Sequence, residues 1–67
     1  MALPRSGPIR SEAARLAILE AATSLFTEGG YEHLTMEGIA RRAGVGKQTV
    51  YRWWPTKGDV IAEAILE

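Results

Sequence analysis

The chain has 67 residues, 46% hydrophobic and 24% charged, which is the composition of one small globular domain and not of a disordered segment. It has no cysteine and one histidine, His33, so we expect no disulfide, no thiolate nucleophile and no metal site. It also lacks a signal-peptide core and any run of about 18 apolar residues. We therefore expect a cytoplasmic protein that does not enter a membrane. We expect no enzyme either, because enclosing a substrate usually takes a larger scaffold.

The charges are unevenly distributed, although the net charge is zero. Residues 12–37 carry five glutamates and one arginine, whereas residues 38–57 carry five basic residues and no acidic one. A basic block of this kind is typical of a surface that binds phosphate. An ordinary solvated surface is the alternative that the charges alone leave open.

Residues 1–10 hold two prolines, one glycine and two arginines, and they are predicted to form a flexible basic arm outside the fold. Arg5 and Arg10 could follow a DNA backbone or enter a minor groove, as basic arms do. An arm that makes no contact is the alternative.

A first helix is predicted to begin after Ser11, a good N-cap, and to end at Gly29-Gly30. Its apolar residues recur at helical spacing and should share one buried face. They are Ala14, Ile18, Leu19, Ala21, Ala22, Leu25 and Phe26.

A second, short helix is predicted between the N-cap Thr35 and Gly44. Leu34 and Ile39 stand at the two positions of a hydrophobic staple. The residues expected to face the core are Met36, Ile39, Ala40 and Ala43.

A third helix is predicted from Lys47 to about Trp53, because Pro55 disfavours helical geometry at Trp54. Thr56 then caps a fourth helix, in which Asp59 stands where an acid complements the helix dipole. Its apolar residues are Val60, Ile61, Ala64 and Ile65. The expected fold is therefore all-α: a small, homeodomain-like helical bundle of three helices and the start of a fourth. A helix-turn-helix occupies about residues 35–54.

The third helix has two different faces. Val50 and Trp54 fall close together on a helical wheel and should face the core, where Trp54 is expected to pack near Phe26 and Ile18. Gln48, Thr49 and Arg52 fall on the opposite face, with Tyr51 and Trp53 on the flanks. Glutamine and arginine are suited to adenine and guanine edges, and flanking aromatic donors can reach phosphates. A short surface helix with ordinary polar residues is the alternative.

The run TMEGIARRAGVGKQTVYRWWPTKGDVIAEAI resembles the N-terminal DNA-binding domain of the TetR family of transcriptional regulators. Two positions depart from the family's pattern. Gly46 stands where serine is usual, which weakens the N-cap of the third helix, and Trp54 replaces the usual phenylalanine. The matching positions are Leu25-Phe26, Gly30-Tyr31, Thr35, Ile39-Ala40, Ala43-Gly44-Val45, Tyr51, Trp54, Lys57 and Ile61.

The resemblance implies sequence-specific binding of double-stranded DNA by residues 11–67, as the head of a regulator, with repression favoured. It assigns base reading in the major groove to Lys47, Gln48 and Arg52. It assigns phosphate contacts to Thr35, Thr49, Tyr51, Trp53 and Lys57, although Thr49 could serve either role. No catalytic residue, metal or cofactor is implied.

The resemblance also implies a C-terminal domain, absent from this chain, that binds a small-molecule effector and forms a homodimer on a palindromic operator. We therefore expect these 67 residues to be mainly monomeric. The alternative function is a small helical protein–protein interaction module without DNA binding. It would need an apolar patch on the outer face of residues 47–53, where Gln48 and Arg52 stand instead.

Other candidates have simpler interpretations. Met36 is expected in the core, and His33 in a turn. Arg41 and Arg42 are expected to be solvated or to act indirectly. The solvated glutamates are expected to be Glu12, Glu20 and Glu63, because no nucleophile or oxyanion donor accompanies them.

Overall fold

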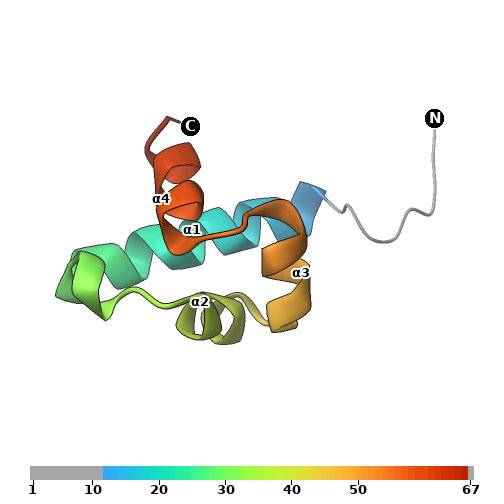
Figure 1. Cartoon of the computed structure of the whole chain (residues 1–67), viewed down its shortest axis with the longest axis horizontal. Coiled ribbons are helices and arrows are strands. Elements are labelled where there is room, and N and C mark those ends of the chain that lie inside the picture. Colours follow the sequence, from blue (N-terminus) through green and yellow to red (C-terminus); the bar gives the residue numbers. More distant parts are fainter. Residues whose placement is uncertain (1–11, 67) are drawn as a thin grey trace.

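A computed structural model of the chain describes residues 12–66, which form four α-helices and no strand. Figure 1 shows α1 (Glu12–Gly29), α2 (Met36–Ala43), α3 (Lys47–Trp53) and α4 (Lys57–Leu66), with a 3-10 turn, η1 (Tyr31–His33), after α1. The all-α class and the positions of the four helices are confirmed. The predicted arm and the expected N-cap Ser11 lie outside the described residues.

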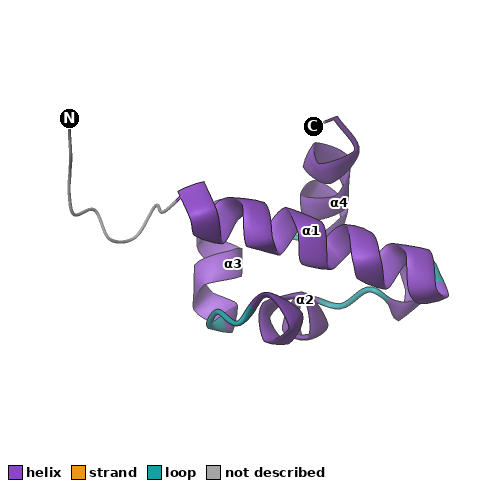
Figure 2. Cartoon of the chain, turned by 180° about the vertical axis from the view of Figure 1, so that it is seen from behind, coloured by secondary structure: helices purple, strands orange, loops and turns teal. Residues whose placement is uncertain are grey.

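Helix α1 is the longest element and contacts both α2 and α4. In Figure 1, α2 lies below α1 and α4 crosses it from above, and Figure 2 shows the same arrangement from behind. One apolar face of α1 therefore supports the other helices. None of the described helices has the length and apolar character that crossing a membrane requires.

The core is one cluster to which all four helices contribute. Leu34 and Ile39, the predicted hydrophobic staple, are both fully buried, and Met36 is buried beside them. Val50 and Val60 bring α3 and α4 into the same cluster. The fully buried side chains are Ile18, Leu34, Ile39, Val50 and Val60.

The helix ends follow the expected capping chemistry. Thr35 Oγ1 accepts the Gly38 N–H at 2.9 Å, which caps α2. Gly44 ends α2 with a φ of 77°, a left-handed conformation that favours glycine. At α4, Thr56 Oγ1 accepts the Asp59 N–H at 3.2 Å, and the Asp59 carboxylate accepts the Thr56 N–H at 3.3 Å. This reciprocal pair is a capping box.

The core position predicted for Phe26 is wrong. Phe26 is 39% exposed and does not belong to the buried cluster, so it does not pack against Trp54 as expected. The periodicity places Phe26 at the edge of the apolar face, on the same flank as Leu19. Helix α4 crosses the middle of α1 (Figure 1), and Leu19 is buried whereas Phe26, seven residues later, is not.

His33 lies in a turn between α1 and α2, as expected, and this turn, η1, has the 3-10 form. It follows Gly30, whose φ of 83° reverses the chain, and His33 folds back onto Gly29. A Cβ at Gly29 would come within 2.5 Å of the His33 side chain. The adjacent pair Gly29-Gly30 therefore does more than end a helix, because one glycine sets the turn and the other makes room for the histidine.

Candidate nucleic-acid interface

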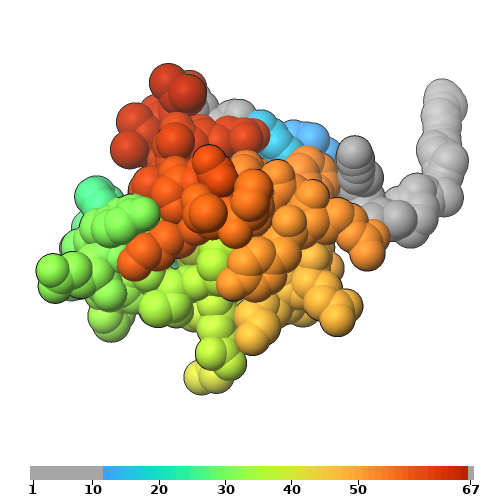
Figure 3. Space-filling model, in the orientation of Figure 1, coloured from blue at the N-terminus to red at the C-terminus, as the bar shows by residue number. Residues whose placement is uncertain are grey.

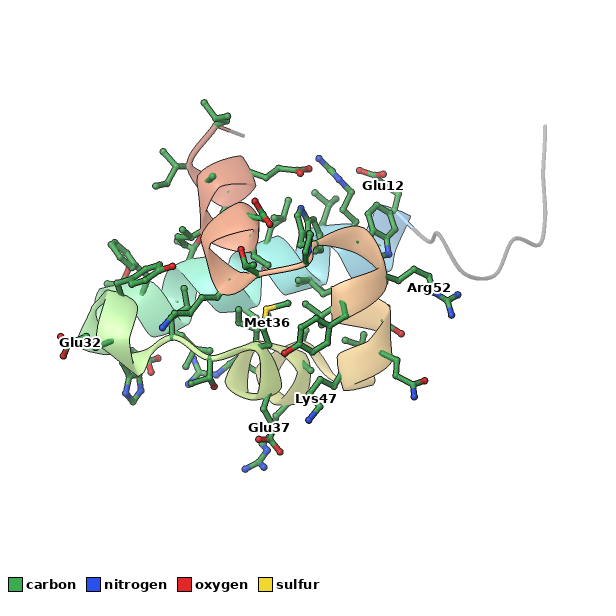
Figure 4. The ribbon with its side chains drawn as sticks, viewed as in Figure 1. Glu12, Glu32, Met36, Glu37, Lys47 and Arg52 are labelled. Atoms are coloured by element: carbon green, nitrogen blue, oxygen red, sulfur yellow. The ribbon has the colours of Figure 1, made fainter. Side chains whose placement is uncertain are left out.

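The two faces of α3 are separated as the sequence predicts. Val50 is fully buried and Trp54 is 4% exposed, whereas Gln48 and Arg52 are exposed and Thr49 is half-buried. Figure 4 shows the side chains of Lys47 and Arg52 pointing away from the body of the molecule. In Figure 3, α2 and α3 together form the lower right edge of the face shown.

The polar groups on this outer face are not used by the fold. Within residues 12–66, the side chains of Lys47, Gln48 and Arg52 form no hydrogen bond or ion pair, and neither does that of Arg41. Helix α3 itself carries no acidic residue. Glu37 of α2 points to the same lower side as Lys47 in Figure 4, so the basic surface has an acid at its border. The donors of α3 remain available to an external ligand.

Two further predicted contacts are at the surface. Tyr51 lies on the flank of α3 and is exposed. Thr35 is exposed at the start of α2, where its oxygen accepts the Gly38 N–H while its hydroxyl proton is not used within the described residues. Both hydroxyls can therefore donate to a phosphate oxygen.

The placement of Trp53 does not fit the phosphate contact predicted for it. Its ring stacks on Trp54 with centroids 5.5 Å apart, and its Nε1 atom is buried. Because Nε1 is buried, its N–H is not presented to solvent. The indole therefore supplies no exposed donor in this conformation.

Lys57 has a structural function that was not predicted. Its Nζ donates to the carbonyl oxygens of Leu34 at 2.9 Å and Tyr31 at 3.1 Å, and it lies 4.4 Å from the centroid of the Tyr31 ring. The ammonium group thus joins the start of α4 to the chain that enters α2. Only one of its three N–H bonds is left for a phosphate.

Arg42 is also used by the fold. It donates to the two carboxylate oxygens of Glu28 at 2.8 and 3.1 Å, joining α2 to the end of α1. The hydrogen bond from Arg42 lowers the pKa of Glu28, and the same bond raises the pKa of Arg42. Arg42 therefore differs from its neighbour Arg41, whose side chain extends into solvent.

Glu63 is not the solvated residue that was expected, so that prediction is wrong. Its carboxylate accepts from Trp54 Nε1 at 2.9 Å and from Arg15 Nη2 at 2.6 Å. The hydrogen bond from Trp54 is the main cause of its lowered pKa, and Arg15 lowers the pKa further. Glu12, which was also expected to be solvated, pairs with Arg15 at 2.8 Å while its side chain stays largely exposed.

The described residues contain no group of three histidine, aspartate or glutamate side chains placed to hold a metal ion. What residues 35–54 do contain is two short helices joined by Gly44-Val45-Gly46, the second of them presenting a polar and basic face. This arrangement defines a helix-turn-helix domain of the DNA-binding class.

Comparison with known proteins identifies the family. The family model for bacterial regulatory proteins of the tetR family matches residues 18–64, which is most of the chain. The chain therefore belongs to the TetR family, as the N-terminal DNA-binding domain of a regulator of this family.

Proteins with similar sequences are named as HTH-type transcriptional regulators. The chain is 42% identical over 62 residues to the uncharacterized HTH-type transcriptional regulator YdeS of Bacillus subtilis (strain 168), covering 92% of this chain and 31% of YdeS. It is 46% identical over 46 residues to YhgD of the same organism, covering 69% of this chain and 24% of YhgD. It is 44% identical over 48 residues to an HTH-type transcriptional regulator of Mycobacterium tuberculosis (strain ATCC 25618 / H37Rv), covering 72% of this chain and 25% of that protein.

The chain thus spans less than a third of the length of these relatives. No solved structure matches it.

Proposed function

We propose that this chain binds double-stranded DNA sequence-specifically, with α3 in the major groove. The observation that carries the proposal is the outer face of α3. Gln48 and Arg52 lie there exposed and without partners among residues 12–66, directly opposite the buried Val50 and Trp54. A helix held by one face and polar on the other has the form of a recognition helix.

Base reading is assigned to three side chains of α3. Arg52 and Lys47 match the paired acceptors of guanine, and the amide of Gln48 can bond both the acceptor and the donor of adenine. All three are exposed and none is held by another group within the described part of the chain. Their hydrogen bonds to bases would not compete with bonds inside the fold.

Phosphate contacts are assigned to the border of this surface. Tyr51 and Thr35 supply exposed hydroxyls, and half-buried Thr49 lies between the two kinds of contact. Lys57 contributes through the one N–H that does not bond a carbonyl. Trp53 is left out of this set because its Nε1 is buried.

The test separates base reading from general DNA affinity. Duplexes that the chain prefers are first selected from random DNA, and binding to a selected and a scrambled duplex is then titrated at one salt concentration. Gln48→Ala and Arg52→Ala are each expected to reduce the preference for the selected duplex by about 1–3 kcal/mol, concentrated at particular base pairs.

Glu20→Ala is the control, because Glu20 is exposed on α1 and has no partner among residues 12–66. It should leave the ratio of the two affinities unchanged. The base-reading assignment would be wrong if both α3 variants kept the wild-type ratio.

We further propose that the full regulator is an effector-controlled repressor that dimerises through its C-terminal domain on a palindromic operator, while these 67 residues are mainly monomeric. The resemblance supports this, as do relatives more than three times as long as the matched segment. Two recognition helices about 34 Å apart would then read successive major grooves. Sedimentation measures whether these 67 residues are monomeric. Titrations with a half-site duplex and with a palindromic duplex then show whether the chain binds each half-site independently. A stable dimer of this chain with nanomolar affinity for the palindrome would contradict the monomeric state.

A further inference from the structure

The C-terminal end of α3 is fastened to two other helices through a single carboxylate. Trp54 Nε1 donates to Glu63 Oε1 at 2.9 Å. Arg15 donates to the other oxygen, Glu63 Oε2, through Nε at 3.2 Å and Nη2 at 2.6 Å. Glu63 of α4 thus joins Arg15 of α1 to the residue that ends α3.

Helix α3 has few other attachments to the fold. It packs mainly on α2, only Val50 of its seven residues is buried, and Trp53 is partly buried against the core. Trp54 at the C-cap anchors the far end of the helix. The Trp54 N–H continues the helix by donating to the Val50 carbonyl at 2.9 Å. Loosening the anchor at the C-terminal end would let so short a helix shift against α2. The hydrogen bond that holds the Trp54 ring therefore restrains the end of α3.

A carboxylate is well suited to hold that ring. The hydrogen bonds from Arg15 to Glu63 are charge-assisted and partly buried, with side-chain exposures of 18% and 37%. With Arg15 holding one oxygen, the carboxylate is fixed in place and its other oxygen is presented to the indole N–H. The indole is a donor only, so rotating the ring away would break this bond without replacing it.

We propose that Glu63 is a positioning residue for base recognition: through Trp54 it fixes the angle at which α3 enters the groove. This inference rests on the proposed function of α3. Glu63 itself touches no base. Its contribution should appear in discrimination between DNA sequences and not in general affinity for DNA.

The experiment compares Glu63→Ala with wild type on a duplex selected by the wild-type chain and on a scrambled duplex, at one salt concentration. We expect the ratio of the two affinities to fall about fivefold or more, which is the lower end of what one base contact supplies. Affinity for the scrambled duplex should stay within about twofold of the control Glu20→Ala, which removes the same charge from an exposed position. A variant that is only less stable loses affinity for both duplexes by the same factor, so the ratio isolates the positioning effect.

A second pair of variants tests the hydrogen bond itself. Trp54→Phe keeps an aromatic ring in the core but removes the N–H, and it should lower the ratio as Glu63→Ala does. The double variant, Glu63→Ala with Trp54→Phe, should lower the affinity ratio no further than the more damaging single variant does, because both substitutions remove the same hydrogen bond. Glu63→Gln keeps an oxygen that can accept from Trp54, so its affinity ratio should lie closer to the wild-type ratio than that of Glu63→Ala. Glu63→Gln also replaces Glu63→Ala in the experiment if circular dichroism shows that the alanine variant is unfolded.

The outcomes separate this inference from the proposed function. A wild-type chain that selects no preferred duplex overturns the proposed function, and this inference with it. A wild-type chain that selects a duplex, while Trp54→Phe and the folded Glu63 variants keep its ratio, overturns this inference alone.

Discussion

The cations of this domain fall into two groups that the fold treats differently. On the outer face of α3, Lys47 and Arg52 are exposed and make no ion pair or hydrogen bond within residues 12–66. On the α1–α4 side, Arg15 and Lys57 donate to a carboxylate and to backbone carbonyls. The same two residue types thus stabilise the fold on one side and are exposed to a ligand on the other.

The comparison shows why counting basic residues overestimates a DNA-binding surface. Five basic residues fall between residues 38 and 57. Two of them, Arg42 and Lys57, are bonded to other parts of the fold. A cation that already donates to an internal partner has fewer hydrogen bonds to offer a phosphate. The proposed DNA-binding surface is therefore smaller and more sharply centred on α3 than the basic block suggests.

The largest expected effect tests the inner face of α3. Trp54→Ala removes a ring that is almost fully buried, as well as the donor to Glu63, and should cost about 3–5 kcal/mol of unfolding free energy. In a domain this small, that loss removes most of the stability. Urea unfolding followed by circular dichroism measures it. The control is Gln48→Ala on the outer face of the same helix, expected within about 0.5 kcal/mol of wild type. Equal stability of the two variants would remove the distinction between the faces.

The next largest effect is a difference in stability between variants of two lysines, each of which begins a helix. Lys57→Ala leaves the carbonyls of Leu34 and Tyr31 without their donor and should cost about 1–2 kcal/mol of unfolding free energy. Lys47→Ala should change this free energy by less than about 0.5 kcal/mol, because no described residue bonds its side chain. Both variants should lower the slope of DNA affinity against salt by about one unit. If Lys57→Ala were as stable as Lys47→Ala, the two groups of cations would not differ as described.

The smallest expected effect is a dependence of stability on pH. Hydrogen bonds from Trp54 and Arg15 hold the pKa of Glu63 below the 4.5 of an ordinary glutamate. A pKa that is lower in the folded state stabilises the fold above pH 4.5, and this stability is lost as the pH falls through the folded-state value. The free energy of unfolding, measured with urea, should therefore fall less between neutral pH and a pH below 4 for Glu63→Gln than for wild type. In the control Glu20→Gln, the unfolding free energy should depend on pH as it does in wild type. If both variants weakened this pH dependence equally, the result would argue against the Glu63 contacts.

Much of the fold could be predicted because local chemistry determines it. The N-cap of α2 depends on Thr35 and the N–H three residues later, and the capping box of α4 depends on Thr56 and Asp59, also three residues apart. The bounds of α3 follow from Gly46 before it and Pro55 after it. The two faces of α3 follow from its helical period. All of these signals lie within one or two turns of the residues that they affect.

The remaining features depend on contacts between distant parts of the chain. Arg15 and Glu63 are 48 positions apart, and Lys57 bonds carbonyls 23 and 26 positions away. A backbone carbonyl acceptor leaves no mark in the residue type, so the structural function of Lys57 had no sequence signal. Phe26 fits the period of the buried face, but whether a position on that face is covered depends on where the other helices pack, and Phe26 is exposed. The proposed DNA contacts themselves stay predictions, because they require a partner.

The stacked indoles give the domain a built-in optical reporter. Both tryptophans of the chain are adjacent, at the junction of α3 and α4, with their rings inclined by 25°. Tryptophan emission depends on the polarity, hydrogen bonding and quenching groups around the ring, so all tryptophan emission of the chain originates from this one junction. Ligand binding that moves α3 against α4 would change the emission, whereas rearrangements around η1 would leave it unaltered. The movement of α3 can therefore be followed in solution without attaching a dye to the protein.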